Sequence, residues 1–132
     1  MPKEFFWLMA TIILTGLMWI PYILDRAAVR GLAGAMGNPS PADKPQAPWA
    51  QRMMAAHANA VENLVLFAPL VLIAHALQIS TATTAAACAV YFWARLAHFI
   101  AHTLGIPVLR TLVWTVGWLA LVVLVLAICR LA

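Results

Sequence analysis

Three long stretches without a charged residue dominate this sequence. They cover Phe5–Leu24, Asn63–Ala94 and Thr111–Cys129, and they are 20, 32 and 19 residues long. A helix that crosses the hydrocarbon core of a membrane needs roughly 20 predominantly apolar residues. Hydrophobic residues make up 65% of the 132-residue chain and charged residues only 9%, whereas soluble domains are about half apolar and about a quarter charged. The sequence therefore predicts an all-α integral membrane protein.

The longest uncharged stretch is divided by its one plausible break, Gln78-Ile79-Ser80-Thr81, and its second part continues to about Leu104. Helices are favoured over a barrel because lipid leaves no water to satisfy the backbone and the alternation of barrel strands is absent. We predict one domain over residues 1–132. It is a bundle of four transmembrane helices at about 4–24, 49–78, 81–104 and 108–130.

Basic residues gather on one side of this predicted bundle. That side carries Arg26, Arg30, Lys44, Arg52 and Arg110, and the opposite side carries Lys3 and Arg130. Positive charge marks cytoplasmic loops, so we expect the long connection in the cytoplasm and both termini outside it. The basic residues form no continuous strip of the kind that binds nucleic acid. We therefore expect membrane lipid, and no nucleic acid, among the partners.

A polar segment, RMMAAHANAVENL, stands at residues 52–64, just ahead of an apolar run. At about 100° per residue, Asn59 and Asn63 fall within about 20° of Arg52 on a helix. Glu62 lies about 60° to one side of them, and His57 points about 140° away from Arg52. The segment thus predicts one polar stripe, from which only His57 is excluded.

The third predicted helix carries a second polar stripe. Four of its residues follow the i, i+4, i+7, i+11 spacing of a single helix face: Tyr91, Arg95, His98 and His102. A short turn makes the second and third helices antiparallel neighbours. We therefore predict that the two stripes meet near the cytoplasmic half of the bundle.

Structural roles compete with functional ones at these positions. Arg52 suits an interfacial anchor, and Glu62 with Arg95 suits a buried ion pair. His98 and His102 could hold a metal or haem with His57 or His75, but two histidines without a third ligand are a weak signal, so we predict no metal site. Tryptophans near the helix ends indicate an aromatic belt: Trp7, Trp19, Trp49 and Trp114.

The polar segment resembles the second-helix signature of the MAPEG family, the membrane-associated proteins in eicosanoid and glutathione metabolism. The matching pattern is Arg52-x4-His57-x-Asn59-x2-Glu62-Asn63 before an apolar helix. The third helix and the start of the fourth are similar to the same family through Arg95-x2-His98-x3-His102 and then Arg110-Thr111. Val29-Arg30 resembles the basic segment that leaves the first helix.

This resemblance implies a homotrimer that binds glutathione, as a cosubstrate, between subunits toward the cytoplasmic side. The compact chain is similar to bacterial members, which implies a bacterial inner membrane. Arg110 would be the catalytic residue beside the thiol, and Arg95 would brace Glu62. The cofactor-binding residues carried over by position, or placed on the same stripes, are Arg30, Arg52, Asn59, Glu62, Arg95, His98 and His102.

Two functions stay open on this evidence. The first is a glutathione-dependent transferase or peroxidase that acts on lipophilic electrophiles or hydroperoxides. The second is a non-catalytic membrane protein that binds lipid or a partner. Ala55 and Ala58 favour the second, because they stand on the turn where glutathione-using relatives carry further arginines.

Overall fold

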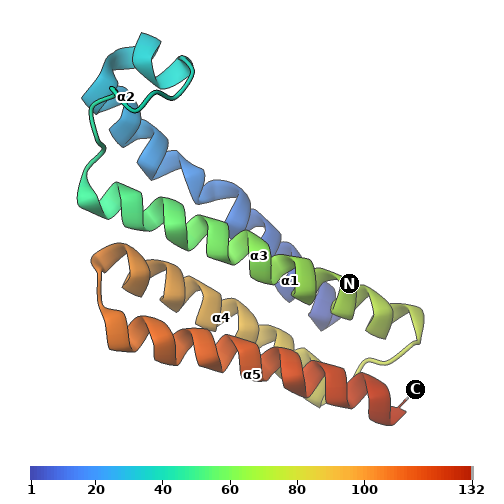
Figure 1. Ribbon diagram of the computed structural model, residues 1–132. Coiled ribbons are helices and arrows are strands. Elements are labelled where there is room, and N and C mark those ends of the chain that lie inside the picture. Colours follow the sequence, from blue (N-terminus) through green and yellow to red (C-terminus); the bar gives the residue numbers. More distant parts are fainter. Residues whose placement is uncertain (132) are drawn as a thin grey trace.

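The computed structural model describes residues 1–131 and consists of helices joined by short turns and by one longer connection, residues 37–47 (Figure 1). The helices are α1 (Lys3–Leu17), α2 (Trp19–Met36), α3 (Pro48–Ala76), α4 (Ala82–Leu104) and α5 (Pro107–Leu131). α1 and α2 form one nearly continuous span, so four segments are long and apolar enough to cross a membrane. The predicted all-α bundle with four membrane spans is confirmed.

Both chain ends lie at the same end of this bundle (Figure 1). α4 packs most extensively against α5, as an antiparallel hairpin, and α3 packs against both α1 and α4. We call the end that holds the chain termini and the α3–α4 turn the terminal end. The opposite end holds the 37–47 connection and the α4–α5 turn, and we call it the loop end.

The first span is longer than the predicted helix over residues 4–24. It runs from Lys3 to Met36, a length of 34 residues. The prediction stopped where charge begins, at Asp25, but a helix can continue out of the hydrocarbon because its charged side chains then reach water. Arg26 and Arg30 therefore lie on α2 and not in the connection.

Two residues interrupt this first span in different ways. Pro21 has no backbone N–H, so the carbonyl of Leu17 lacks its usual helical partner. Met18 nevertheless keeps a right-handed helical backbone, with φ −61° and ψ −24°, and the helix direction continues. Gly31 has φ +72°, which glycine adopts without steric cost, and it turns residues 32–36 away from the axis of α2.

The connection after α2 is held against that helix by the buried side chain of Gln46. Its Nε2 donates to the carbonyl oxygen of Tyr22 at 2.7 Å and to Asp25 at 3.2 Å, and its Oε1 accepts from Arg26 Nε at 3.2 Å. Polar groups thus satisfy one another where the chain leaves the membrane. These hydrogen bonds therefore fix the connection against α2 at the loop end.

At the terminal end, a buried carboxylate ties α1 to the start of α4. Glu4 is only 4% exposed, and its oxygens accept hydrogen bonds from the hydroxyls of Ser80 and Thr84. Thr81 and Thr84 also form a capping box at the α4 N-terminus, which satisfies backbone N–H groups that the helix leaves free. Every polar group named here has a partner.

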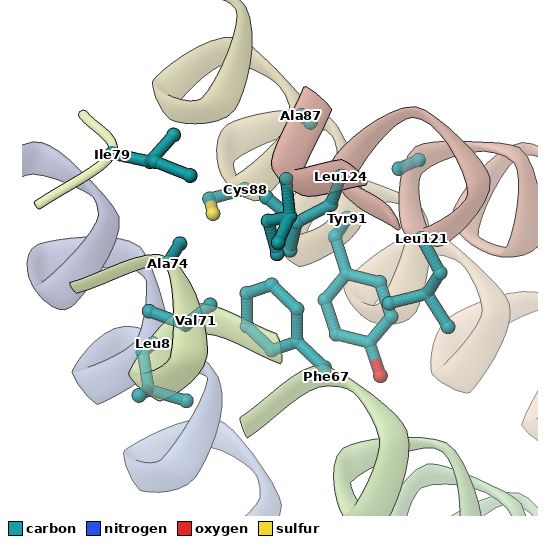
Figure 2. Close-up of a cluster of buried hydrophobic side chains, with 12 residues drawn as sticks. Leu8, Phe67, Val71, Ala74, Ile79, Ala87, Cys88, Tyr91, Leu121 and Leu124 are labelled. Atoms are coloured by element: carbon teal, nitrogen blue, oxygen red, sulfur yellow. The ribbon is translucent and has the colours of Figure 1, made fainter. Parts of the chain in front are cut away.

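The apolar core joins α1, α3, α4 and α5 (Figure 2), and it reaches the terminal end through Ile79 in the α3–α4 turn. Its centre is the stacked pair of Phe67 on α3 and Tyr91 on α4, whose ring centroids are 4.0 Å apart. Cys88 lies in the same cluster as a fully buried small side chain. The other members are Leu8, Val71, Ala74, Ile79, Ala87, Ala120, Leu121, Leu124 and Ile128.

Candidate functional site

Helix α3 divides the polar segment between two neighbours. A hydrogen bond of 2.7 Å joins His57 Nδ1 to the hydroxyl of Tyr22 on α2. Asn59 lies on the other side of α3, where its Oδ1 accepts from Arg95 of α4 at 2.6 Å. Asn63, one turn on, donates to the carbonyl oxygen of Asn59 at 2.8 Å. The predicted separation of His57 from the polar stripe is therefore present.

The stripe on α4 faces inward. Arg95 and His98 are 2% and 3% exposed, and Arg95 Nη2 lies 3.4 Å from His98 Nδ1. Gly117 of α5 packs beside this arginine, and a Cβ there would lie at ordinary van der Waals distance, 3.6 Å, from Arg95 Cδ. The two predicted stripes meet at the contact between Asn59 and Arg95.

A cavity of about 220 Å³ opens beside this contact, toward the loop end. Its walls come from α3, α4 and α5, and its lining residues are Asn59, His98, His102, Arg110, Thr111 and Trp114. Among residues 1–131, the buried atoms Arg95 Nε and His102 Nδ1 have no hydrogen-bond partner. The cavity wall and the arginine next to it therefore retain polar groups that can bind a ligand.

The α4–α5 turn brings Arg110 to this cavity. Gly105 has φ +75° and ends α4 in the left-handed conformation that glycine favours at helix C-termini. Pro107 then opens α5, where its missing N–H costs nothing. Because the turn is so short, Arg110 in the first turn of α5 faces the same cavity as His102 in the last turn of α4.

Arg52 occupies a different position from the cavity-lining residues. Its Nε donates to the carbonyl oxygen of Thr103 at 2.9 Å, and a Cβ on Gly105 would lie 3.1 Å from the same nitrogen. A cation beside the last carbonyls of a helix is favourable because it meets the negative end of the helix dipole. In the single chain, Arg52 thus holds the start of α3 to the end of α4.

Comparison with known proteins identifies the family of the chain. The sequence model of the MAPEG family matches residues 5–130, nearly the whole chain. The chain belongs to the MAPEG family. No curated protein and no solved structure matches it.

The expected pairing of Glu62 with Arg95 is absent from this MAPEG chain. Within residues 1–131 no ion pair joins them, and Glu62 is exposed on α3. Asn59 takes the position opposite Arg95 instead, because Glu62 is rotated about 60° from it around the helix axis. A carboxylate therefore stands on the outer surface of α3, halfway along a membrane-spanning helix.

Arg30, the predicted binding residue on α2, contacts the connection in the single MAPEG chain. Its Nε donates to the carbonyl oxygen of Lys44 at 2.8 Å, and Nη1 lies 3.5 Å from Asp43. It does not line the cavity between α3, α4 and α5. The structure thus brings Asn59, His98, His102 and Arg110 together and leaves Arg30, Arg52 and Glu62 outside that group.

One residue of the cavity was assigned to another role from the sequence. Trp114 was expected in the aromatic belt, but it lines the cavity one helical turn beyond Arg110. The i, i+4 spacing of Arg110 and Trp114 places them on one face of the helix, and this spacing was the sequence signal that both line the same cavity.

The two histidines of α4 pack edge to face, with ring centroids 5.4 Å apart. Across residues 1–131 no three His, Cys, Asp or Glu side chains gather closely enough to hold a metal ion. His57 contacts Tyr22, and His75 packs on Phe5. Neither is therefore placed as a third ligand beside His98 and His102.

Proposed function

We propose that this MAPEG protein is a membrane-bound glutathione-dependent transferase or peroxidase that acts on lipophilic electrophiles or hydroperoxides. One observation carries the proposal. Arg110, at the start of α5, lines the same cavity as Asn59 and His98. A cation at a helix N-terminus, next to the amide of Asn59 and the imidazole of His98, suits a bound thiolate.

The chemistry follows from the properties of thiols. A free thiol has a pKa of about 8.5, and the thiolate is the reactive nucleophile. A guanidinium and the positive end of the α5 dipole both favour the anion. In this proposal Arg110 is the catalytic residue, because it lies beside the glutathione sulfur.

Both candidate reactions need no cosubstrate other than glutathione. In conjugation, the thiolate sulfur forms a bond to an electrophilic carbon, and either a leaving group departs with the bonding pair or the adduct takes up a proton. In peroxide reduction, two glutathione molecules supply two electrons, so that the hydroperoxide becomes an alcohol and water while glutathione disulfide forms. The surrounding bilayer concentrates lipophilic substrates.

The size of the cavity supports a binding site shared between neighbouring subunits, which in this proposal form a homotrimer. Its volume of about 220 Å³ falls below the roughly 300–1,000 Å³ of typical ligand pockets, so a second wall is needed for a tripeptide. Glu62 is exposed in the middle of α3, where a charge facing lipid would cost roughly 2.5–3.5 kcal/mol. A neighbouring subunit would remove that carboxylate from lipid.

Individual roles follow from these positions. Asn59, His98 and His102 contact glutathione directly, and Arg95 orients Asn59. Glu62 holds the amino group of the tripeptide, and Arg30 takes one of its carboxylates at the subunit boundary. Arg52 contributes by fixing the α4–α5 turn that carries Arg110.

The same proposal places the site on the cytoplasmic side of a bacterial inner membrane. The loop end carries Arg26, Arg30, Lys44, Arg52 and Arg110, and the terminal end carries Lys3 and Arg130. Basic residues favour the cytoplasm. The single domain that we propose for residues 1–132 would then have both of its termini outside the cytoplasm.

The test is glutathione-dependent activity of the detergent-purified protein. Conjugation is measured with 1-chloro-2,4-dinitrobenzene, and peroxide reduction with cumene hydroperoxide. Arg110→Ala should lower the rate by about 10²–10³-fold, as expected for the loss of one group that stabilises developing or bound negative charge.

Lys3→Ala is the matched control, since it removes a positive charge at the opposite end of the bundle and should leave the rate unchanged. Full activity in Arg110→Ala would remove this residue from the mechanism. Inactivity of the unaltered protein towards both substrates would contradict the proposed reaction.

A second candidate is a non-catalytic protein that binds lipid or a partner. Ala55 and Ala58 support it, because both are exposed on α3 and supply no cation for a tripeptide with two carboxylates. Titration calorimetry with glutathione separates the two functions. Binding in the micromolar to low-millimolar range favours the enzyme, and its absence favours the non-catalytic protein.

A further inference from the structure

Two adjoining hollows run along the outer face of the α4–α5 hairpin. One, of about 540 Å³, extends from Thr83 to Val90 on α4 and from Val116 to Val123 on α5. The other, of about 420 Å³, lies at the terminal end and reaches Arg130. Because both are lined by Thr83 and Val123, they form one continuous groove, which we call the hairpin groove.

The hairpin groove is polar at one end and apolar along the rest of its length. Thr81, Thr83 and Arg130 line its terminal end, whereas Ala86, Val90 and Val116 line the deeper part. Val116 and Arg130 are 14 residues apart on α5, about 21 Å at 1.5 Å per residue. That length covers the interface and one leaflet of a hydrocarbon core roughly 30 Å thick.

We propose that the hairpin groove binds a glycerophospholipid of the leaflet on the terminal side. The phosphodiester accepts hydrogen bonds from the Arg130 guanidinium and from the hydroxyls of Thr81 and Thr83. One acyl chain lies along the apolar part, where Ala86 leaves space between Val90 and the side chains of α5. This site is at the opposite end of the bundle from Arg110, so it is independent of the glutathione proposal.

The charges of the chain favour a lipid over a second copy as the occupant. Arg130 is a cation that an anionic occupant would complement, and the chain has four acidic side chains. Asp25 and Asp43 belong to the loop end, and Glu62 lies halfway along α3. Glu4 is the only acidic side chain near the terminal end, and it is buried against Ser80 and Thr84. In a parallel assembly no exposed acidic side chain lies at the depth of Arg130, whereas the lipid phosphate does.

The experiment compares two lipids with identical acyl chains by native mass spectrometry of the detergent-purified protein. Dipalmitoylphosphatidylglycerol contains the phosphodiester, and dipalmitoylglycerol does not. We expect the protein to retain the phospholipid preferentially. Arg130→Ala should weaken phospholipid retention roughly five-fold, the effect of one basic residue at a lipid surface, and should leave dipalmitoylglycerol retention unchanged. Ala86→Trp should fill the groove and lower the retention of both lipids.

Matched controls separate these effects from general damage. Lys3→Ala removes a charge at the same end of the bundle, and Ile12→Trp adds an indole on the exposed face of α1; both should bind lipid as the unaltered protein does. The helical circular dichroism of each variant confirms folding, and Val123→Phe replaces Ala86→Trp if the latter does not fold.

Phospholipid retention in Arg130→Ala equal to that of the unaltered protein overturns the proposal. So does a disulfide cross-link between copies through Ala86→Cys, because a second copy then occupies the groove.

Discussion

The two ends of the bundle use the same helices in opposite ways. Toward the terminal end, α3 and α4 contribute the Phe67–Tyr91 stack, and the buried carboxylate of Glu4 is matched by two hydroxyls. Toward the loop end, the same helices contribute Asn59 and Arg95, and the guanidinium keeps a buried nitrogen without a partner among residues 1–131. Buried polar groups without partners destabilise a fold. Three of the four such side-chain atoms found among residues 1–131, Arg95 Nε, His102 Nδ1 and Thr103 Oγ1, lie toward the loop end, and the fourth is the Tyr91 hydroxyl in the stack itself. The loop end is therefore the part better suited to binding.

Of the substitutions considered, the one with the largest expected loss of stability lies in the terminal half of the bundle. Phe67→Ala removes the centre of the apolar cluster and should lower the free energy of unfolding by about 3–5 kcal/mol. Glutathione affinity should change little, because Phe67 does not line the cavity. Chemical unfolding of the detergent-solubilised protein and calorimetry measure the two quantities. Phe6→Ala is the control, since that ring is 50% exposed. Loss of glutathione affinity with unchanged stability would contradict the separation of the two ends.

Arg95 lies where the two halves meet, and its replacement should have an intermediate effect. Arg95→Leu removes the 2.6 Å hydrogen bond to Asn59 Oδ1 and leaves that oxygen only the longer one from Asn63 at 3.3 Å, which should lower stability by about 1–3 kcal/mol. Breaking a buried ion pair with Glu62 would instead lower it by about 3–5 kcal/mol. Thermal unfolding of the variant measures the difference, and Asn59→Ala should remove the same contact. A loss of stability of about 3–5 kcal/mol in Arg95→Leu, together with a small loss in Asn59→Ala, would falsify the pairing of Arg95 with Asn59.

The smallest effect is expected on the far side of α3. Tyr22→Phe removes the hydrogen bond to His57 and should lower stability by about 0.5–1.5 kcal/mol. Glutathione binding should be unaffected, because this contact faces α2 and not the cavity. His57→Phe should lower stability by a similar amount and should also leave glutathione binding unaffected. A fall in glutathione affinity in either variant would show that the binding site extends to this side of α3.

Helical periodicity accounts for what was predicted correctly. It fixes angles around an axis, so it separated His57 from Asn59 and placed Arg95 and His98 on one face. The uncharged stretches likewise predicted four spans. These properties depend only on the local sequence and on the regular geometry of helices.

The remaining errors concern distances and the ends of helices. Periodicity placed Glu62 and Asn59 on the same broad stripe, but a rotation of about 60° decides which of them meets Arg95. Arg52 reaches the carbonyl of Thr103 through its long side chain, and no spacing rule predicts that contact. The end of the first helix was placed by charge, although Asp25 and Arg26 continue the helix. The roles of the site residues in glutathione binding stay predictions.

The length of the first span also fixes where the loop end lies relative to the membrane. Its straight part, residues 3–30 before the break at Gly31, measures about 42 Å at 1.5 Å per residue, which exceeds a hydrocarbon core of roughly 30 Å by about 12 Å. Glu4 is bonded to the α3–α4 turn, so the excess length emerges on the other side. Residues 37–47 consequently lie outside the hydrocarbon core on that side, and we expect that a protease added to that side alone can reach them.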